Sequence, residues 1–492
     1  MSTTEAAAPQ SPVETIDVKP VNAKAERSLY AKRIKVFPKR VKGTFRTTKW
    51  FVMAITLGIY YGAPWLRWDR GEHLPDQAIL LDFPARRFYF FFIEIWPQEI
   101  YYVTGLLILA ALTLFLVTSV AGRVWCGYSC PQTVWTDLFI TIERWIEGDR
   151  NARMRLDKAT WTKDKIVKRV VKHLIWLLVA VATGGAWVFY FADAPTLAGQ
   201  LLAFEAPLIA YIFIAVFTAT TYLLGGLARE QVCTYMCPWP RIQGAMFDEN
   251  SFLISYRTFR GEPRGKHKKG ESWEGRGHCI DCNQCVAACP MGIDIRDGPQ
   301  LECIQCALCI DACNTVMDKI DLPRGLIAYE TDRNLAAEAQ GSHARIRLIR
   351  PRTIIYATGI VLVGLVMLAT LLTRSDLDVN VLRDRNPLFV TLSDGNLRNG
   401  YTIKILNKQY DTRHFVISTE GLPGAELSGV GLGEGKELDV AVEPDNLRSI
   451  RLFVTAPASE MTSESHPLTF VIQDQSGPGR VTSETTFRGP ER

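Results

Sequence analysis

The stretches CIDCNQCVAACP (residues 279–290) and CIQCALCIDACN (residues 303–314) decide the fold of the middle of this chain, because each contains four cysteines spaced C-x2-C-x2-C-x3-C. In two-cluster ferredoxins with this spacing, three thiolates of a run bind one iron–sulfur cluster and the fourth binds the other. We therefore predict two [4Fe-4S] clusters with crossed ligands. The cluster-1 set is Cys279, Cys282, Cys285 and Cys313, and the cluster-2 set is Cys303, Cys306, Cys309 and Cys289.

Two other uses of these eight cysteines were weighed. C-x2-C pairs also bind zinc, but zinc sites usually take two pairs separated by a longer loop instead of four cysteines in one compact run. Disulfides are disfavoured because the predicted topology places these thiols in a reducing compartment. Pro290 follows the first run as expected, whereas Asn314 stands where the second proline would be, which changes only the local turn.

Five apolar segments of the chain are long enough to cross a lipid bilayer, which takes about 17 to 25 residues. They are Trp50–Leu66, Ile100–Ala121, Leu174–Ala192, Pro207–Ala228 and Thr353–Thr373. No apolar region of the signal-peptide type precedes the first segment, so we expect that segment to direct insertion. The sequence therefore predicts a multi-pass membrane protein.

The positive charges between these segments predict the orientation. The Lys and Arg count is 11 in residues 1–49, 4 in 67–99, 11 in 122–173, 0 in 193–206 and 17 in 229–352. Because loops rich in Lys and Arg stay in the cytoplasm, the N-terminus and the cysteine runs are expected there. An odd number of spans leaves the segment after Arg374 on the outer side, the periplasm of a bacterial inner membrane.

A second cysteine pattern, C-x-Y-x-C-P, occurs as Cys126–Pro131 and again as Cys233–Pro238, about 107 residues later. Each copy follows a predicted span of the same direction, and parallel repeats are related by an axis along the membrane normal. We therefore expect Cys126, Cys130, Cys233 and Cys237, here called the membrane-edge cysteines, to form one four-thiolate site.

The local geometry of this pattern also follows from its residues. Positions i and i+4 of a helix share a face, so the two cysteines of a copy can stand one above the other. The proline disfavours helix at the cysteine before it. Soft thiolates favour Cu(I), zinc or an iron–sulfur cluster, and a structural zinc clip joining the spans is the alternative that stays open.

The C-terminal segment has short alternating runs separated by Gly, Asn, Asp and Pro, which predict a β-sandwich. The runs are Leu388–Leu392, Tyr401–Leu406, Phe415–Ser418, Leu438–Val442, Ile450–Val454 and Leu468–Ile472. This segment contains no cysteine, so its stability must come from a packed core.

Composition excludes several classes of protein. The 492 residues are 48% hydrophobic and 22% charged, which rules out a disordered chain and a small disulfide-stapled scaffold. The net charge of +5 is too small to indicate nucleic-acid binding.

The order of these parts resembles the cytochrome oxidase accessory proteins of the CcoG, FixG or RdxA family, over roughly residues 30–490. The resemblance implies a membrane-bound polyferredoxin that reduces Cu(II) to Cu(I) for assembly of cbb-type oxidase. It also implies an immunoglobulin-like C-terminal fold and assigns the copper chemistry to the membrane-edge cysteines. Expected partners are the membrane, copper ions, a copper chaperone or transporter and oxidase assembly factors, with a homodimer allowed and no nucleic acid.

The predicted fold class is thus an α-helical membrane protein of about five transmembrane helices, with a cytoplasmic two-[4Fe-4S] ferredoxin-like domain and a C-terminal immunoglobulin-like β-sandwich. The domains are an N-terminal tail (1–48), four helices with both C-x-Y-x-C-P copies (49–256), the ferredoxin-like domain (257–352), the fifth helix (353–373) and the β-sandwich (374–492). Two other functions stay open: a quinol dehydrogenase subunit and a non-catalytic assembly scaffold. The electron donor is not specified, and the membrane-edge cysteines could hold one metal, two metals or a third cluster.

Overall fold

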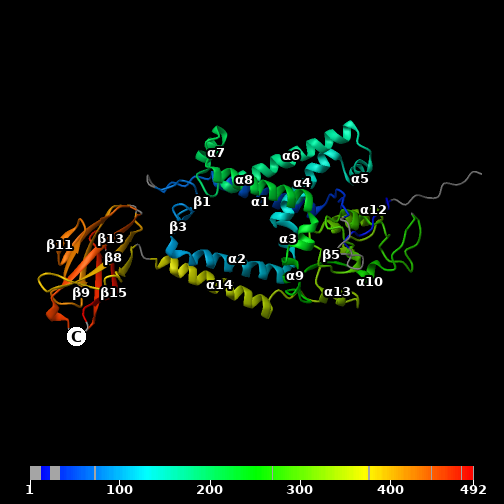
Figure 1. Ribbon diagram of the computed structural model, residues 1–492. Coiled ribbons are helices and arrows are strands. Elements are labelled where there is room, and N and C mark those ends of the chain that lie inside the picture. The colour runs from blue at the N-terminus through cyan, green and yellow to red at the C-terminus, as the bar shows by residue number, and fades with distance from the viewer. Residues whose placement is uncertain are drawn as a thin grey trace, which may run out of the picture. The chain divides into compact units, whose positions relative to one another are not determined.

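The computed structural model describes residues 13–22, 34–70, 74–268, 270–374, 377–409, 411–444, 446–461, 463–477 and 479–490 (Figure 1). The chain divides into two compact units, Met1–Met367 and Leu368–Arg492. The first contains the cysteines and most of the helices, and the second is rich in β-strands. Much of the predicted N-terminal tail, residues 1–12 and 23–33, lies outside the described residues.

All five predicted spans fall on helices. These are α1 (Thr44–Gly62), α2 (Tyr101–Ala121), α6 (Lys163–Val188), α8 (Leu208–Thr220), which continues as a π-helical segment (Thr221–Ala228), and α14 (Pro351–Leu372). Within the described residues, three helices are long and apolar enough to cross a membrane: Pro97–Ala121, Leu208–Ala228 and Pro351–Leu372. The protein is therefore of the membrane type, and the number of five crossings stays a prediction.

Thr183 on α6 joins three helices through hydrogen bonds. Its carbonyl oxygen accepts from the Tyr60 hydroxyl at 2.7 Å, and its Oγ1 lies 2.8 Å from the Tyr61 hydroxyl. The same Oγ1 accepts from Trp135 Nε1 at 3.0 Å. These bonds link α1 and α4 (Pro131–Glu147) to α6. Hydrogen bonds between helices are one of the interactions that hold apolar helices together in a membrane.

Three helices follow α2: α3 (Val124–Tyr128), α4 (Pro131–Glu147) and α5 (Arg150–Lys158). Helix α4 buries Glu143, whose carboxylate accepts from Arg229 at 2.8 Å and from Arg153 at 3.2 Å. Lys172 of α6 lies 3.5 Å from the same carboxylate. Since a buried charge is tolerated only when paired, these contacts fix α4 against its neighbours and so fix the position of Cys130 at its start.

The connections between the long helices contain short elements of their own. Strands β1 (Ile79–Asp82), β2 (Arg87–Phe90) and β3 (Ile93–Ile95) form an antiparallel sheet between α1 and α2. Helix α7 (Ala194–Ala203) lies between α6 and α8, and α9 (Trp239–Gly244) follows the second C-x-Y-x-C-P copy.

The cysteine runs lie in a small α/β region. Strands β4 (Leu253–Tyr256) and β5 (Ile327–Glu330) pair antiparallel. Helix α11 (Gln284–Ala288) carries the third cysteine of the first run, and α12 (Leu308–Lys319) carries the last two of the second run. Helices α10 (Thr258–Gly261) and α13 (Asp332–Glu338) complete it. The N-terminal segment packs on this region, since the backbone N–H of Ile16 donates to the carbonyl of Cys282 at 3.1 Å.

The second unit consists of two antiparallel sheets, in the strand orders β11-β10-β13-β8-β6 and β12-β9-β14-β15, with β7 paired to β8. Inward residues alternate along β8, where Tyr401, Ile403 and Ile405 are fully buried, and Phe470 of β14 joins them in the core. The strands are β6 (Leu377–Arg383), β7 (Val390–Thr391), β8 (Leu397–Asn407), β9 (Arg413–Glu420), β10 (Glu426–Gly429), β11 (Gly433–Gly435), β12 (Glu437–Val442), β13 (Asn446–Ala456), β14 (Ser465–Asp474) and β15 (Arg480–Arg488).

Five of the six predicted runs fall on strands of this unit, and the sixth, Leu388–Leu392, overlaps only the two-residue strand β7. Strands β6, β10, β11 and β15 were not predicted from the sequence. Strand β15 reads RVTSETTFR, so its inward side carries too few apolar residues to stand out, and β10 and β11 are short and rich in glycine. Pairing with an already formed neighbour, not the local pattern, makes these segments strands.

Candidate functional site

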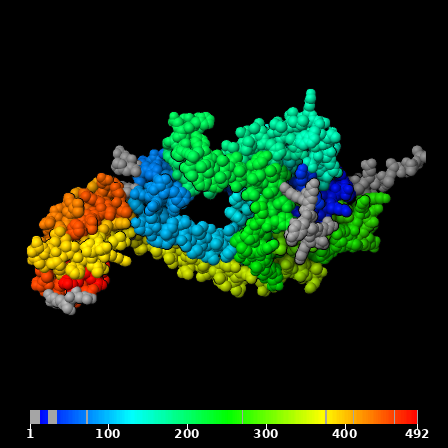
Figure 2. Space-filling model, in the orientation of Figure 1, coloured from blue at the N-terminus to red at the C-terminus, as the bar shows by residue number. Residues whose placement is uncertain are grey.

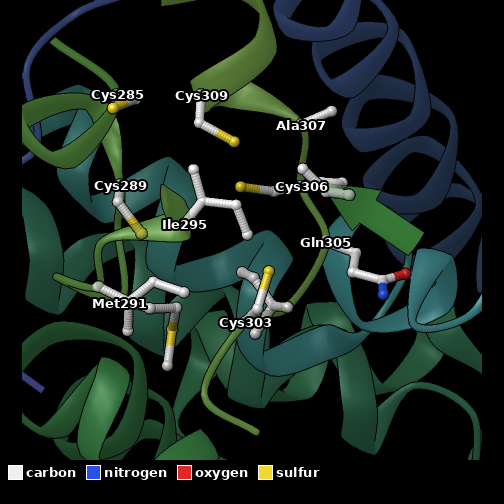
Figure 3. A pocket seen from close by; sticks show the side chains of 12 residues that line it. Cys285, Cys289, Met291, Ile295, Cys303, Gln305, Cys306, Ala307 and Cys309 are labelled. Atoms are coloured by element: carbon white, nitrogen blue, oxygen red, sulfur yellow. The ribbon is translucent and has the colours of Figure 1, made fainter. Parts of the chain in front are cut away.

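The cluster-2 set gathers around one cavity. Cys289, Cys303, Cys306 and Cys309 all line it, together with Cys285 and apolar side chains such as those of Met291 and Ile295. Figure 3 shows the sulfurs of these four cysteines around a shared space, although Cys289 belongs to the first run and the other three to the second. This grouping is the one that crossed ligation predicts, and the thiol-rich, otherwise apolar lining suits an iron–sulfur cluster.

The cluster-1 set lines a second cavity, formed by Cys279, Cys282, Cys285 and Cys313 with apolar residues of α12 and β5. Cys285 lines both cavities, so the two sites adjoin. The residues present thus fit two clusters, and the assignment of individual ligands stays a prediction. Within the described part of the chain, no three His, Cys, Asp or Glu side chains converge closely enough to hold a single metal ion.

Both runs use the same unusual backbone conformation. In the first run, Asp281 and Asn283 flank the second cysteine with φ of 53° and 56°; in the second run, Gln305 and Ala307 do so with φ of 54° and 60°. Left-handed conformations are uncommon outside glycine and cost free energy, most clearly for Ala307, which has no polar side chain to compensate. Since the same strain recurs in both runs, we infer that it serves to turn successive sulfurs toward one cavity.

Burial controls the protonation of these thiols. It raises the pKa of Cys303 to about 11, against the opposing effects of the Gln305 backbone N–H and the Arg123 guanidinium. It likewise raises the pKa of Cys289 to about 12. Because thiolate is the form that binds metal, cluster binding must displace these protons.

The membrane-edge cysteines lie in the short elements after α2 and α8. Cys126 is on α3, and Cys233 is in a second π-helical segment, Val232–Met236. Cys130 and Cys237 have extended backbones, with ψ of 128° and 122°. The effect expected of the following prolines is therefore confirmed, while the second copy adopts π-helix where a regular helical turn was expected.

These four thiols are close enough to interact electrostatically. Burial raises the pKa of Cys126 to about 12, and the charges of Cys130 and Cys237 raise it further. Burial also raises the pKa of Cys233 to about 12, with added contributions from Cys130, Cys126 and Cys237. The two copies are therefore near each other, and their union in one four-thiolate site stays a prediction. Cys237 is exposed, whereas the other three are partly buried.

The membrane-edge cysteines adjoin the cluster-2 cavity. Cys126 and Cys233 pack against a buried apolar group in which Cys306 lies, and Cys289 and Cys303 pack against the same group. Its members are Met291, Ile293, Ile304, Cys306 and Leu308. The two thiol sites therefore share one apolar wall.

Arg123, just before the first C-x-Y-x-C-P copy, and Gly127, within it, form the junction between the membrane-edge cysteines and the second cysteine run. The backbone N–H of Arg123 donates to Gln305 Oε1 at 2.7 Å, and its guanidinium donates to the carbonyls of Leu301 and Cys303. Neither residue received a role from the sequence. Comparison of the two C-x-Y-x-C-P copies could have singled out Gly127, because the matching position of the second copy is Thr234, which has a side chain.

Replacing Gly127 by alanine is expected to disrupt this junction. The added Cβ would lie 2.8 Å from the carbonyl oxygens of Ile304 and Gln305 and 3.0 Å from Cys306 Cα, all backbone atoms that cannot rotate away. We expect a loss of about 1–3 kcal/mol in stability, measured by thermal unfolding, with lowered iron content. Gly185→Ala on α6 is the matched control, because its Cβ meets no atom within 4 Å. Equal behaviour of the two variants would contradict the role given to Gly127.

Comparisons with known proteins agree with this architecture. Residues 228–332 match the family described as a 4Fe-4S dicluster domain, which includes both cysteine runs and the second C-x-Y-x-C-P copy. Residues 103–149 match a 4Fe-4S binding domain, which includes the first copy. Residues 367–490 match the IG-like fold at the C-terminus of FixG, so the second unit is immunoglobulin-like.

Whole-length relatives were also found. The chain is 51% identical to the nitrogen fixation protein FixG of Rhizobium meliloti, over 97% of each protein. It is 55% identical to protein RdxB of Cereibacter sphaeroides, over 94% of this chain and 98% of that protein. It is 50% identical to protein RdxA of the same organism, over 92% of this chain and 96% of that protein.

Proposed function

Because this chain belongs to the FixG family and is an iron–sulfur protein of the electron-transfer type, we propose that it is a membrane-bound cupric reductase. The substrate is Cu(II), the product is Cu(I), and the Cu(I) serves assembly of a cbb-type haem–copper oxidase. The observation that carries the proposal is the shared apolar wall between the membrane-edge cysteines and the cluster-2 cavity.

The chemistry of the membrane-edge cysteines supports this proposal. Thiolates stabilise Cu(I) over harder ions, so a four-thiol site makes reduction of bound Cu(II) more favourable. Cys237 is exposed and the neighbouring Met236 is 62% exposed, which leaves a side from which copper can approach. The [4Fe-4S] clusters, bound by the two cysteine sets, would supply single electrons.

We further propose the bacterial inner membrane as the location, with the ferredoxin-like domain in the cytoplasm and the immunoglobulin-like domain in the periplasm. The contact of Ile16 with Cys282 supports a shared side for the N-terminal segment and the cysteine runs. Four crossings, by α1, α2, α6 and α8, would lie between the N-terminal segment and the cysteine runs. Because four is an even number, both would then be on the same side of the membrane. A copper chaperone or transporter would take the Cu(I), and a homodimer remains part of the proposal.

The test uses purified full-length protein under argon. The protein is reduced with dithionite, freed of excess reductant and mixed with Cu(II) in the presence of a chromogenic Cu(I) chelator. We expect about two Cu(I) per chain, one electron from each cluster. The control is the same protein oxidised beforehand. Formation of Cu(I) no faster than in that control would overturn the proposal.

One alternative use of the membrane-edge cysteines has a specific observation in its favour. The match to a 4Fe-4S binding domain over residues 103–149 includes Cys126 and Cys130, so these cysteines with Cys233 and Cys237 could hold a third cluster. Iron analysis separates the two readings: about eight iron atoms per chain fit two clusters, and about twelve fit three.

A further inference from the structure

A cavity of about 490 Å³ lies beside the cluster-2 set, at the end of the helical region that faces the cysteine runs. Its walls come from α1, the end of α2, α3 and β5. They include Phe45, Val52, Val117, Trp125, Tyr128 and Tyr329. The volume is in the range of small-molecule sites, which are usually apolar with a few placed polar groups.

The polar groups of this cavity point toward the iron–sulfur region. The Tyr329 hydroxyl donates to the carbonyl of Gln305, next to Cys306 in the second run. The Tyr128 side chain lines the same cavity as that of Tyr329. Tyr128 also sits in the C-x-Y-x-C-P copy between Cys126 and Cys130. A ligand that reaches the two hydroxyls is therefore next to both thiol sites.

The other walls suit a molecule dissolved in lipid. None of the residues that line the cavity is charged, so a phosphorylated donor such as a nicotinamide dinucleotide would find no cation there. Trp125 is 40% exposed, and Val52 and Val117 belong to the apolar helices α1 and α2. Figure 2 shows an opening between α2 and α8 in the same helical region.

We propose that this cavity binds a lipid-soluble quinol, which is the electron donor of the protein. The inference rests on the proposed function, because that function supplies the acceptor. One quinol loses two electrons and two protons and becomes a quinone; two Cu(II) ions take up the electrons and become two Cu(I) ions. The protons pass to water on the side of the membrane that holds the ferredoxin-like domain. The Tyr329 hydroxyl oxygen, whose hydrogen is donated to Gln305, accepts a hydrogen bond from a quinol hydroxyl, and Tyr128 lies beside it in the same cavity.

The test begins with binding, in lipid nanodiscs that contain the full-length holoprotein. A short-chain azidoquinone is cross-linked by light and the labelled peptides are identified by mass spectrometry. We expect labelling of peptides that contain Val52, Val117 or Trp125, competed by unlabelled quinone. Val52→Trp and Val117→Trp each fill the cavity from opposite walls and are expected to reduce this labelling at least tenfold. The matched control is Val216→Trp, on the exposed side of α8.

A second readout separates this inference from the proposed function. Dithionite-reduced protein, freed of excess reductant, is mixed either with a short-chain quinone or with Cu(II), and cluster oxidation is followed by absorbance. The tryptophan variants are expected to lose rapid oxidation by quinone and to retain oxidation by Cu(II). Unchanged labelling and quinone reactivity in both variants would overturn the quinol site. Loss of the Cu(II) reaction in the wild-type protein, with quinone reactivity intact, would overturn the cupric reductase and leave the quinol site standing.

Discussion

Replacing Cys126 and Cys130 together by serine is expected to abolish Cu(I) formation while both [4Fe-4S] signals persist. Serine keeps the size of the side chain but removes the soft sulfur ligand, so the site no longer favours Cu(I). Loss of groups that only support metal ligands already costs about 10–100-fold, so loss of two thiols should reduce the rate by more than about 100-fold. The measurements are the chelator assay for Cu(I) and electron paramagnetic resonance of the reduced protein.

Met236→Leu is the matched control for this double variant. Met236 also carries sulfur and adjoins Cys237, but its side chain is exposed. We expect its Cu(I) formation to stay within about twofold of wild type, since an exposed thioether contributes little to packing. Undiminished activity in the double serine variant would reject the role of the membrane-edge cysteines. Loss of about four iron atoms per chain along with activity, with the signals of the two other clusters in place, would instead mean that these cysteines hold a third cluster.

The second large effect concerns the crossed ligands of the ferredoxin-like domain. Cys289→Ser is expected to remove the cluster of the second run, even though Cys289 lies in the first run. Its sulfur shares a cavity with those of Cys303, Cys306 and Cys309. We expect iron to fall from about eight to about four atoms per chain, and Cu(I) formation to be lost because the remaining cluster lies farther from the membrane-edge cysteines.

Cys313→Ser is the matched partner, because it makes the same chemical change at the same position of the other run. Cys313 lines the cavity of the first run, so this variant should lose the other cluster and keep the one beside Cys126 and Cys233. The two variants should therefore show different residual spectra by electron paramagnetic resonance. Identical residual spectra, or loss of the first-run cluster in Cys289→Ser, would contradict crossed ligation.

Much of this protein is determined by local sequence. The apolar segments fall on helices because a membrane-length apolar stretch can satisfy its backbone only internally. Five of the six alternating runs of the C-terminal segment fall on strands that bury one face. The run Leu388–Leu392 overlaps only β7, whose two residues are exposed. The proline after Cys130 and after Cys237 leaves the preceding residue extended, which is a steric effect between neighbours.

Other features depend on residues that are far apart in the chain. Strand β15 forms because β14 offers it a partner, not because of its own pattern. The left-handed conformations at Gln305 and Ala307 persist because the surrounding fold holds them there. The cavity between Val52, Val117, Trp125 and Tyr329 unites side chains from four elements, so no local pattern could reveal it.

The sequence by itself thus determined the spacing of the cysteine runs, the apolar helices and six of the ten described strands of the second unit, since each depends on spacing or periodicity within a few turns of chain. The assignment of ligands to each cluster stays a prediction. Only the tertiary structure decided that Gly127 touches the backbone of the second run and that Cys126 and Cys233 share an apolar wall with Cys303. These contacts join residues more than 60 positions apart. They arise from packing between elements, which the order of residues along the chain does not express.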